Sequence, residues 1–255
     1  MQTVDCPKAA LFDLDDTLAE SFESPSEEII GKLLKLLDFI PVAIITGRDL
    51  QWMAADFLAK FASSPHFERF FVLPEGSAQC LQWNGNIWEE LYGQTLTLEE
   101  LGYISKTIMQ SARETEVMAG LPVYGKQLVE KSAMVAFAML GVGVPRDLKY
   151  SWDPGNIKRL KLRDDLAKRL PDYEVVLGGA TSVDVTKKGV NKSYGVRFLA
   201  KHLGIASQDM MYVGDALYPG GNDHVVIETG IKTRSTSGPE ETSRIIDELI
   251  PALSI

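Results

Sequence analysis

The sequence predicts an α/β fold in which a parallel-sheet core carries an inserted α+β domain, and three observations predict it. Short apolar segments alternate with amphipathic helical patterns over the first 84 residues, a rhythm typical of parallel sheets. That rhythm stops at an Asn-Gly turn and returns near residue 188. The chain has 255 residues, of which 45% are hydrophobic, so it is large enough for a core and an insert.

The expected core elements follow in chain order. Apolar runs predict buried strands at residues 9–12, 42–45, 70–73 and 210–213. Helical patterns begin after Ser26, run over about 49–61 and 192–203, and begin again at Pro239. Proline in the first helical position and the acids after it favour that last start.

The expected insert is more irregular. Trp83–Trp88 contains an Asn-Gly pair and predicts a hairpin. Beyond it we expect a helix near 97–116, a β-like segment at 133–140 and a charged helix near 156–170. We therefore assign 1–84 and 188–255 to a core domain and 85–187 to an inserted domain.

The charge and the cysteines exclude several classes of protein. The formal net charge is −9 and the pI is about 4.9, which argues against nucleic-acid binding because that needs a basic surface. The only cysteines, Cys6 and Cys80, have neither zinc-site spacing nor the density of a disulfide scaffold. No signal core or membrane-spanning run is evident, so we expect a cytoplasmic protein without a membrane partner.

The most informative residues are Asp13 and Asp15, which directly follow the first expected strand. Ligands of parallel sheets bind beyond the carboxyl ends of the strands. Two carboxylates at that edge can hold a divalent cation and still leave one oxygen free to attack a substrate.

Three further groups fall at expected strand ends or helix starts. These groups are Thr46, Lys192, and Gly214-Asp215 with Asn222-Asp223. Each alone is explained equally well by a turn or a solvated side chain. Together they suit phosphoryl transfer, with a carboxylate nucleophile, a second acid for proton transfer, and a hydroxyl and an ammonium for the transferred group.

In their order and spacing these groups resemble motifs I to IV of the haloacid dehalogenase superfamily of phosphotransferases. The resemblance implies a Rossmann-like core with an inserted C2-type cap that determines substrate specificity. Two segments, residues 178–184 with 188–192 and residues 214–224, are similar to the phosphomannomutase-like branch.

The resemblance also implies residue roles and a small phosphorylated substrate. Asp13 is the expected nucleophile and Asp15 the general acid and base. The full set comprises Asp13, Asp15, Thr46 and Lys192 for catalysis, Asp13, Asp15, Asp215 and Asp223 for Mg²⁺, and Gly47, Arg48, Lys131, Ser182, Asp184 and Asn222 for substrate.

Two departures favour a phosphatase over a phosphomannomutase. Lys131 stands where the resemblance leads us to expect a cap arginine, and a lysine lacks the bidentate fork that grips a distal phosphate. Thr46-Gly47-Arg48 also looks more like the phosphatase members. We therefore expect hydrolysis of a sugar phosphate or a similar metabolite, with phosphomannomutase as the alternative.

Two further possibilities are kept. A phosphoacceptor signalling module also combines aspartates with a lysine and a hydroxyl, although such modules are about half this length. The apolar segment Met134–Leu140 could also pair across a homodimer through the cap.

Overall fold

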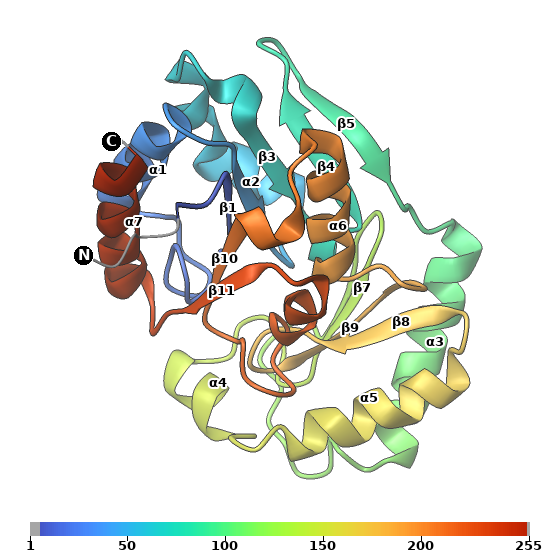
Figure 1. The fold of residues 1–255 in the computed structure, drawn as a ribbon. Coiled ribbons are helices and arrows are strands. Elements are labelled where there is room, and N and C mark those ends of the chain that lie inside the picture. Colours follow the sequence, from blue (N-terminus) through green and yellow to red (C-terminus); the bar gives the residue numbers. More distant parts are fainter. Residues whose placement is uncertain (1–5, 254–255) are drawn as a thin grey trace. The chain divides into compact units, whose positions relative to one another are not determined.

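The structure is a computed structural model that describes residues 6–253, apart from the side chains of residues 62 and 63. It contains two compact units (Figure 1). The first runs to Gly93 and resumes at Lys192, and the second spans Gln94–Asn191. None of the helices in the described range has the length and apolar character needed to cross a membrane.

The first unit is built on a seven-stranded sheet of order β11-β10-β1-β2-β3-β4-β5. The five strands from β11 to β3 are parallel, and β4 and β5 are antiparallel to their neighbours. The strands are β1 Ala9–Phe12, β2 Val42–Ile45, β3 Phe70–Leu73, β4 Gln79–Trp83, β5 Trp88–Gly93, β10 Met210–Gly214 and β11 Lys232–Ser235.

Helices cover both faces of this sheet. They are α1 Glu27–Leu37, α2 Leu50–Asp56, α6 Lys192–Leu203 and α7 Pro239–Leu253, with short 3-10 helices at Leu58–Ser63, Phe67–Arg69, Glu75–Ser77, Ser207–Asp209 and His224–Thr229. Successive strand residues point to opposite faces. Phe12 and Ile44 therefore pack with α1 and α7, whereas Leu11 and Tyr212 pack with α6.

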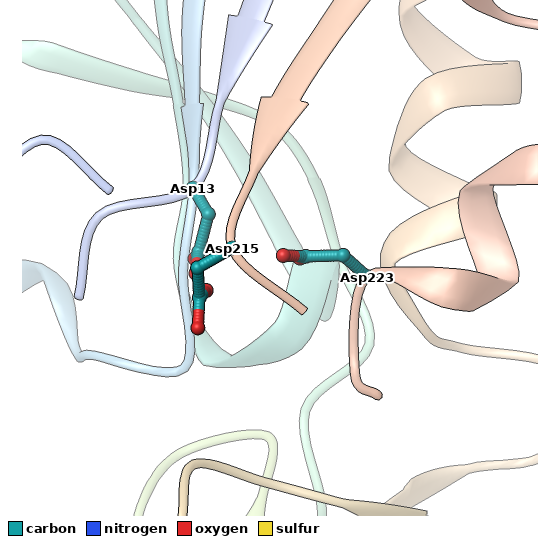
Figure 2. A group of neighbouring side chains, drawn as sticks. All are labelled: Asp13, Asp215 and Asp223. Atoms are coloured by element: carbon teal, nitrogen blue, oxygen red, sulfur yellow. The ribbon is translucent and has the colours of Figure 1, made fainter. Parts of the chain in front are cut away.

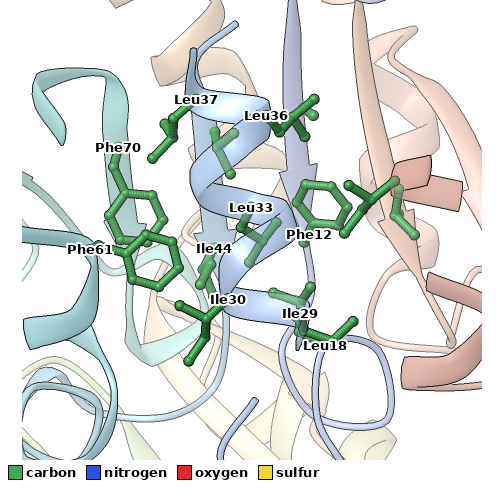
Figure 3. Close-up of a cluster of buried hydrophobic side chains, with 14 of the residues drawn as sticks. Phe12, Leu18, Ile29, Ile30, Leu33, Leu36, Leu37, Ile44, Phe61 and Phe70 are labelled. Atoms are coloured by element: carbon green, nitrogen blue, oxygen red, sulfur yellow. The ribbon is translucent and has the colours of Figure 1, made fainter. Parts of the chain in front are cut away.

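The α1 contact shows why the sequence forms this layer. Ser26 caps the helix by accepting a hydrogen bond from the Ile29 N–H, and two glutamates occupy the first turn. The buried stripe of α1 then packs on β1 and β2 (Figure 3). Beside it, the rings of Phe61 and Phe70 are stacked with their centroids 4.1 Å apart.

The second unit is an antiparallel sheet of order β6-β7-β9-β8 with helices on one face. Its elements are α3 Leu98–Glu114, β6 Leu128–Glu130, β7 Val135–Ala138, α4 Arg146–Ser151, α5 Ile157–Arg169, β8 Tyr173–Leu177 and β9 Ser182–Lys187. Ile104, Ile108, Leu162 and Leu166 of α3 and α5 pack against Val183 and its neighbours in the sheet. The α/β fold with an α+β insert is thus confirmed.

Three expected boundaries are corrected. We placed the start of the insert at residue 85, but β5 pairs with β4 and so belongs to the core sheet, because the Asn-Gly turn only reverses the strand. The units change at Gly93 and Asn191 instead of at 84 and 187. The helix expected over 49–61 ends at Asp56, where Phe57 has a φ of −133°, and continues as a 3-10 helix.

Candidate active site

The first unit brings the core motifs to one edge of its sheet. Asp13 follows β1 and its N–H donates to the Val213 carbonyl over 2.9 Å. Thr46 follows β2, with its N–H on the Leu73 carbonyl at 3.0 Å. Asp215 follows β10, and Lys192 is the first residue of α6. Parallel pairing of these strands is the reason their ends meet.

Lys192 is the centre of a buried polar network. Its Nζ donates to Asp13 Oδ1 over 2.7 Å and to Asp223 Oδ1 over 2.6 Å. Asp223 is fully buried and also accepts a hydrogen bond from the Ala216 N–H on Oδ2, over 3.1 Å. Gly214 makes this possible, since a side chain there would collide with the Asp223 carboxylate.

The site is electrostatically unbalanced, because two buried carboxylates, Asp13 and Asp223, and the partly buried Asp215 face one ammonium. Burial raises the pKa of Asp13 well above its usual range, although Lys192 acts in the opposite direction. Burial, together with the Asp223 charge, raises the pKa of Asp215 to about 7. Burial alone would lower the pKa of Lys192, but Asp13 and Asp223 outweigh it and raise that pKa.

The same three carboxylates fit a divalent cation. Asp13, Asp215 and Asp223 each offer an oxygen, and these oxygens lie within 4.8 Å of one another (Figure 2). Carboxylate oxygens are the ligands that Mg²⁺ prefers. A cation there would relieve the excess negative charge that the raised pKa values of Asp13 and Asp215 reveal.

Asp15 lies near this group in a different setting. Arg48 donates to both of its oxygens, with Nε 3.0 Å from Oδ2 and Nη2 2.5 Å from Oδ1. The Phe22 N–H also donates to Oδ1, over 3.0 Å. The guanidinium lies 4.2 Å from the ring centroid of Phe22 and 4.6 Å from that of Trp52. We expected Arg48 on the substrate, but this structure pairs it with the expected acid and base.

The remaining core residues surround the same edge. Thr46 is fully buried, and its Oγ1 accepts a hydrogen bond from the Arg48 N–H at 3.1 Å. Its hydroxyl proton can still be donated to a ligand. Gly47 and Asn222 adjoin Thr46 and Asp223 in the chain, so the backbone places them at this edge as well.

Lys131, Ser182 and Asp184 belong to the second unit. Ser182 and Asp184 lie on β9 and point away from α3 and α5, because the intervening Val183 packs with those helices. Lys131 follows β6, and its backbone N–H donates to the Met134 carbonyl over 2.9 Å.

Sequence reasoning missed Tyr212. This residue lies in the middle of β10, its side chain is fully buried, and its hydroxyl lies 2.6 Å from Asp223 Oδ1. One signal in the sequence could have indicated Tyr212, because it places a phenol in an otherwise apolar strand that leads to the Gly214-Asp215 pair. Phe22 and Trp52 were also missed, because ring contacts with Arg48 depend on side-chain directions that the sequence pattern does not contain.

Phosphomannomutases are similar to this chain along nearly its whole length. The enzyme of Saccharomyces cerevisiae is 25% identical over 253 residues, which cover 94% of this chain and 92% of that protein. The enzyme of Galdieria sulphuraria is 24% identical over 251 residues, covering 94% of this chain and 93% of that protein. The family model described as eukaryotic phosphomannomutase matches residues 126–252.

Solved structures with the same fold include hydrolases. A truncated, IMP-bound IMP-nucleotidase of Plasmodium falciparum has a TM-score of 0.75 at 16% identity, covering 98% of this chain and 69% of that one. A haloacid dehalogenase-like hydrolase from Bacteroides thetaiotaomicron has a TM-score of 0.62 at 14% identity, covering 95% and 99%. At these identities the likeness shows the fold alone.

Fold, site and similarities together make this chain similar to enzymes of the haloacid dehalogenase superfamily, with a second unit inserted into the core. Within that superfamily the chain is phosphomannomutase-like, which confirms the resemblance seen in its motifs. The second unit and the similarity to enzymes along the chain argue against a signalling module.

Proposed function

We propose that the protein transfers a phosphoryl group from a small phosphorylated sugar to Asp13, and from Asp13 to an acceptor, with Mg²⁺ as cofactor. The observation that carries this proposal is the contact between Asp13 and Lys192, beside the carboxylates of Asp215 and Asp223. It supplies a nucleophile, a cation and a metal-ligand set at one sheet edge.

The chain's own residues can perform both half-reactions. One Asp13 oxygen attacks phosphorus, the bond to the leaving oxygen breaks, and Asp15 protonates that oxygen. Lys192 and Thr46 then hold the charge that develops on the phosphoryl oxygens. In the second half-reaction Asp15 takes a proton from the acceptor, which attacks phosphorus and releases Asp13. Asp13, Asp215 and Asp223 would hold Mg²⁺, and the resemblance adds the backbone carbonyl of Asp15 to this set. The ion would supply positive charge between the attacking carboxylate and the phosphate.

The acceptor distinguishes two candidate functions, and the comparisons favour the one that we ranked second. The relatives and the family match are phosphomannomutases, whereas the sequence pattern favours a phosphatase. We therefore take the interconversion of mannose 6-phosphate and mannose 1-phosphate as the first candidate, with the sugar hydroxyl of the phosphorylated intermediate as acceptor.

Hydrolysis remains the second candidate because Lys131 stands where the resemblance leads us to expect a cap arginine. A lysine lacks the bidentate fork with which an arginine grips a distal phosphate. A mutase must bind a phosphate at both ends of its intermediate, whereas a phosphatase needs only one phosphate site.

One assay separates the candidates. Purified protein with Mg²⁺ is given mannose 1-phosphate and a catalytic amount of hexose bisphosphate, and both mannose 6-phosphate and free phosphate are measured. Mannose 6-phosphate without phosphate release supports the mutase, and stoichiometric phosphate without isomerisation supports the phosphatase. Neither product from a panel of sugar phosphates would contradict both.

The cytoplasmic location and the homodimer through the cap stay predictions. No step of the proposed reaction depends on either of them.

A further inference from the structure

The buried hydroxyl of Tyr212 has no role in the reaction described so far. Tyr212 lies on β10 opposite Leu11 of β1, and its side chain is fully buried. Its oxygen is 2.6 Å from Asp223 Oδ1 and 3.3 Å from Lys192 Nζ. The phenol therefore contacts both the carboxylate and the ammonium of the Lys192 network.

Counting donors fixes the direction of each hydrogen bond. An ionised carboxylate only accepts, so the single phenolic proton is donated to Asp223. A lone pair of the phenol oxygen then faces Lys192, whose ammonium has three donors. Those donors point to Asp13, Asp223 and Tyr212, at 2.7, 2.6 and 3.3 Å.

This count has a consequence for substrate binding. All three Lys192 donors have acceptors within the first unit, so a phosphoryl oxygen can bind Lys192 only by replacing one of them. The two carboxylate contacts are short and charge-assisted, and the Tyr212 contact is the longest. The donor that faces Tyr212 is therefore the one most easily exchanged.

We propose that Tyr212 is a positioning residue for phosphoryl transfer. Its hydroxyl orients Asp223, holds the third Lys192 donor in the substrate-free site, and yields that donor to a phosphoryl oxygen. This inference rests on the proposed function, because it concerns how Lys192 meets the transferred group. The ring itself packs in an apolar cluster, so the hydroxyl is the part of the side chain that contacts the Lys192 network.

Tyr212→Phe tests the proposal, with Tyr92→Phe as the matched control. Both changes remove one hydroxyl from a largely buried ring of the first unit, and the Tyr92 hydroxyl donates to the Ser77 carbonyl at 2.9 Å. We expect Tyr212→Phe to lower kcat by about tenfold with KM within about twofold, since the donor matters most in the transition state. Tyr92→Phe should leave both constants unchanged.

Anion binding gives a readout that is independent of turnover. Orthovanadate resembles the transition state and inorganic phosphate the ground state, so their dissociation constants are measured by calorimetry with Mg²⁺ present. Tyr212→Phe should raise the dissociation constant of vanadate about tenfold and leave that of phosphate within about twofold of the wild-type value. The Tyr212→Phe variant should fold, because phenylalanine fills the same space as tyrosine. Melting curves of the wild type, Tyr212→Phe and Tyr92→Phe identify a temperature at which all three are native.

Two results would overturn the proposal. One is a ratio of vanadate affinity to phosphate affinity that is the same in Tyr212→Phe as in the wild type. The other is a change of this ratio in Tyr92→Phe that is as large as the change in Tyr212→Phe. If the wild type binds both anions but converts no sugar phosphate, the proposed function fails while the Tyr212 inference is still decided by the anion ratio.

Discussion

Replacement of Asp13 by asparagine is expected to abolish phosphoryl transfer and, at the same time, to raise the thermal stability of the metal-free protein. The loss of activity follows because an amide cannot form the acyl phosphate, and removal of a nucleophile costs at least about 10³-fold in rate. Activity is measured as substrate consumption with Mg²⁺, so that transfer to sugar or to water is counted.

The stability gain follows from the charge balance of the site. Asp13 has a raised pKa, which means that the folded state favours its neutral form. At pH 7 the ionised carboxylate therefore destabilises the fold relative to a neutral residue of the same shape. Asparagine still offers an oxygen to Lys192. We expect the Tm to rise by about 2–4 °C, as a gain of about 1 kcal/mol gives for a chain of this size.

Asp38→Asn is the matched control, because Asp38 is exposed at the end of α1 in the same unit. It should change neither activity nor Tm. A lower Tm for Asp13→Asn would show that the carboxylate stabilises the fold, and retained activity would exclude Asp13 as the nucleophile.

Replacement of Lys192 by methionine is expected to destabilise the first unit strongly. The variant keeps the buried carboxylates of Asp13 and Asp223 and the partly buried Asp215, and it removes the ammonium that contacts the first two. Breaking a buried ion pair from one side costs about 3–5 kcal/mol. Urea unfolding at pH 7.5, without metal, measures this loss.

The sign of the pH dependence identifies the cause. Without the ammonium, the folded carboxyls bind protons at a higher pH than the unfolded ones, whose pKa is about 3.9. Asp215 already has a pKa of about 7 in the unmodified site. The stability loss of Lys192→Met should therefore grow as the pH rises from about 5 to about 8.

Lys201→Met, an exposed change on the same helix, should show no such loss at any of these pH values. A loss in Lys192→Met that does not depend on pH would instead indicate lost packing, and would contradict the electrostatic account of the site.

The sequence predicts most of the core because its strands are short, apolar and well punctuated. Asp13, Thr46, Lys192 and Asp215 could be placed together because parallel strands end at one sheet edge. Strand β11 was not expected, because its residues Lys-Thr-Arg-Ser are polar and exposed at the sheet edge. The boundary of the insert was misplaced because a hairpin signal does not say which sheet the second strand joins.

The finer arrangement of the site depends on side-chain directions. No spacing rule links Arg48 to Asp15 or Tyr212 to Asp223, because each pair comes from separate segments and meets only through packing. The choice between sugar and water as acceptor is harder still to read, because it depends on weakly patterned cap residues such as Lys131 and Asp184.

Covalent phosphorylation of Asp13 is the most direct test of the proposed reaction. Protein mixed with a sugar phosphate and Mg²⁺ is quenched in acid within a single turnover, and its peptides are mapped by mass spectrometry. We predict one phosphoryl group on the peptide that contains Asp13, absent from Asp13→Asn, whether the acceptor is a sugar or water. Turnover with no phosphorylated peptide, or with the phosphoryl group on another residue, would contradict transfer through Asp13.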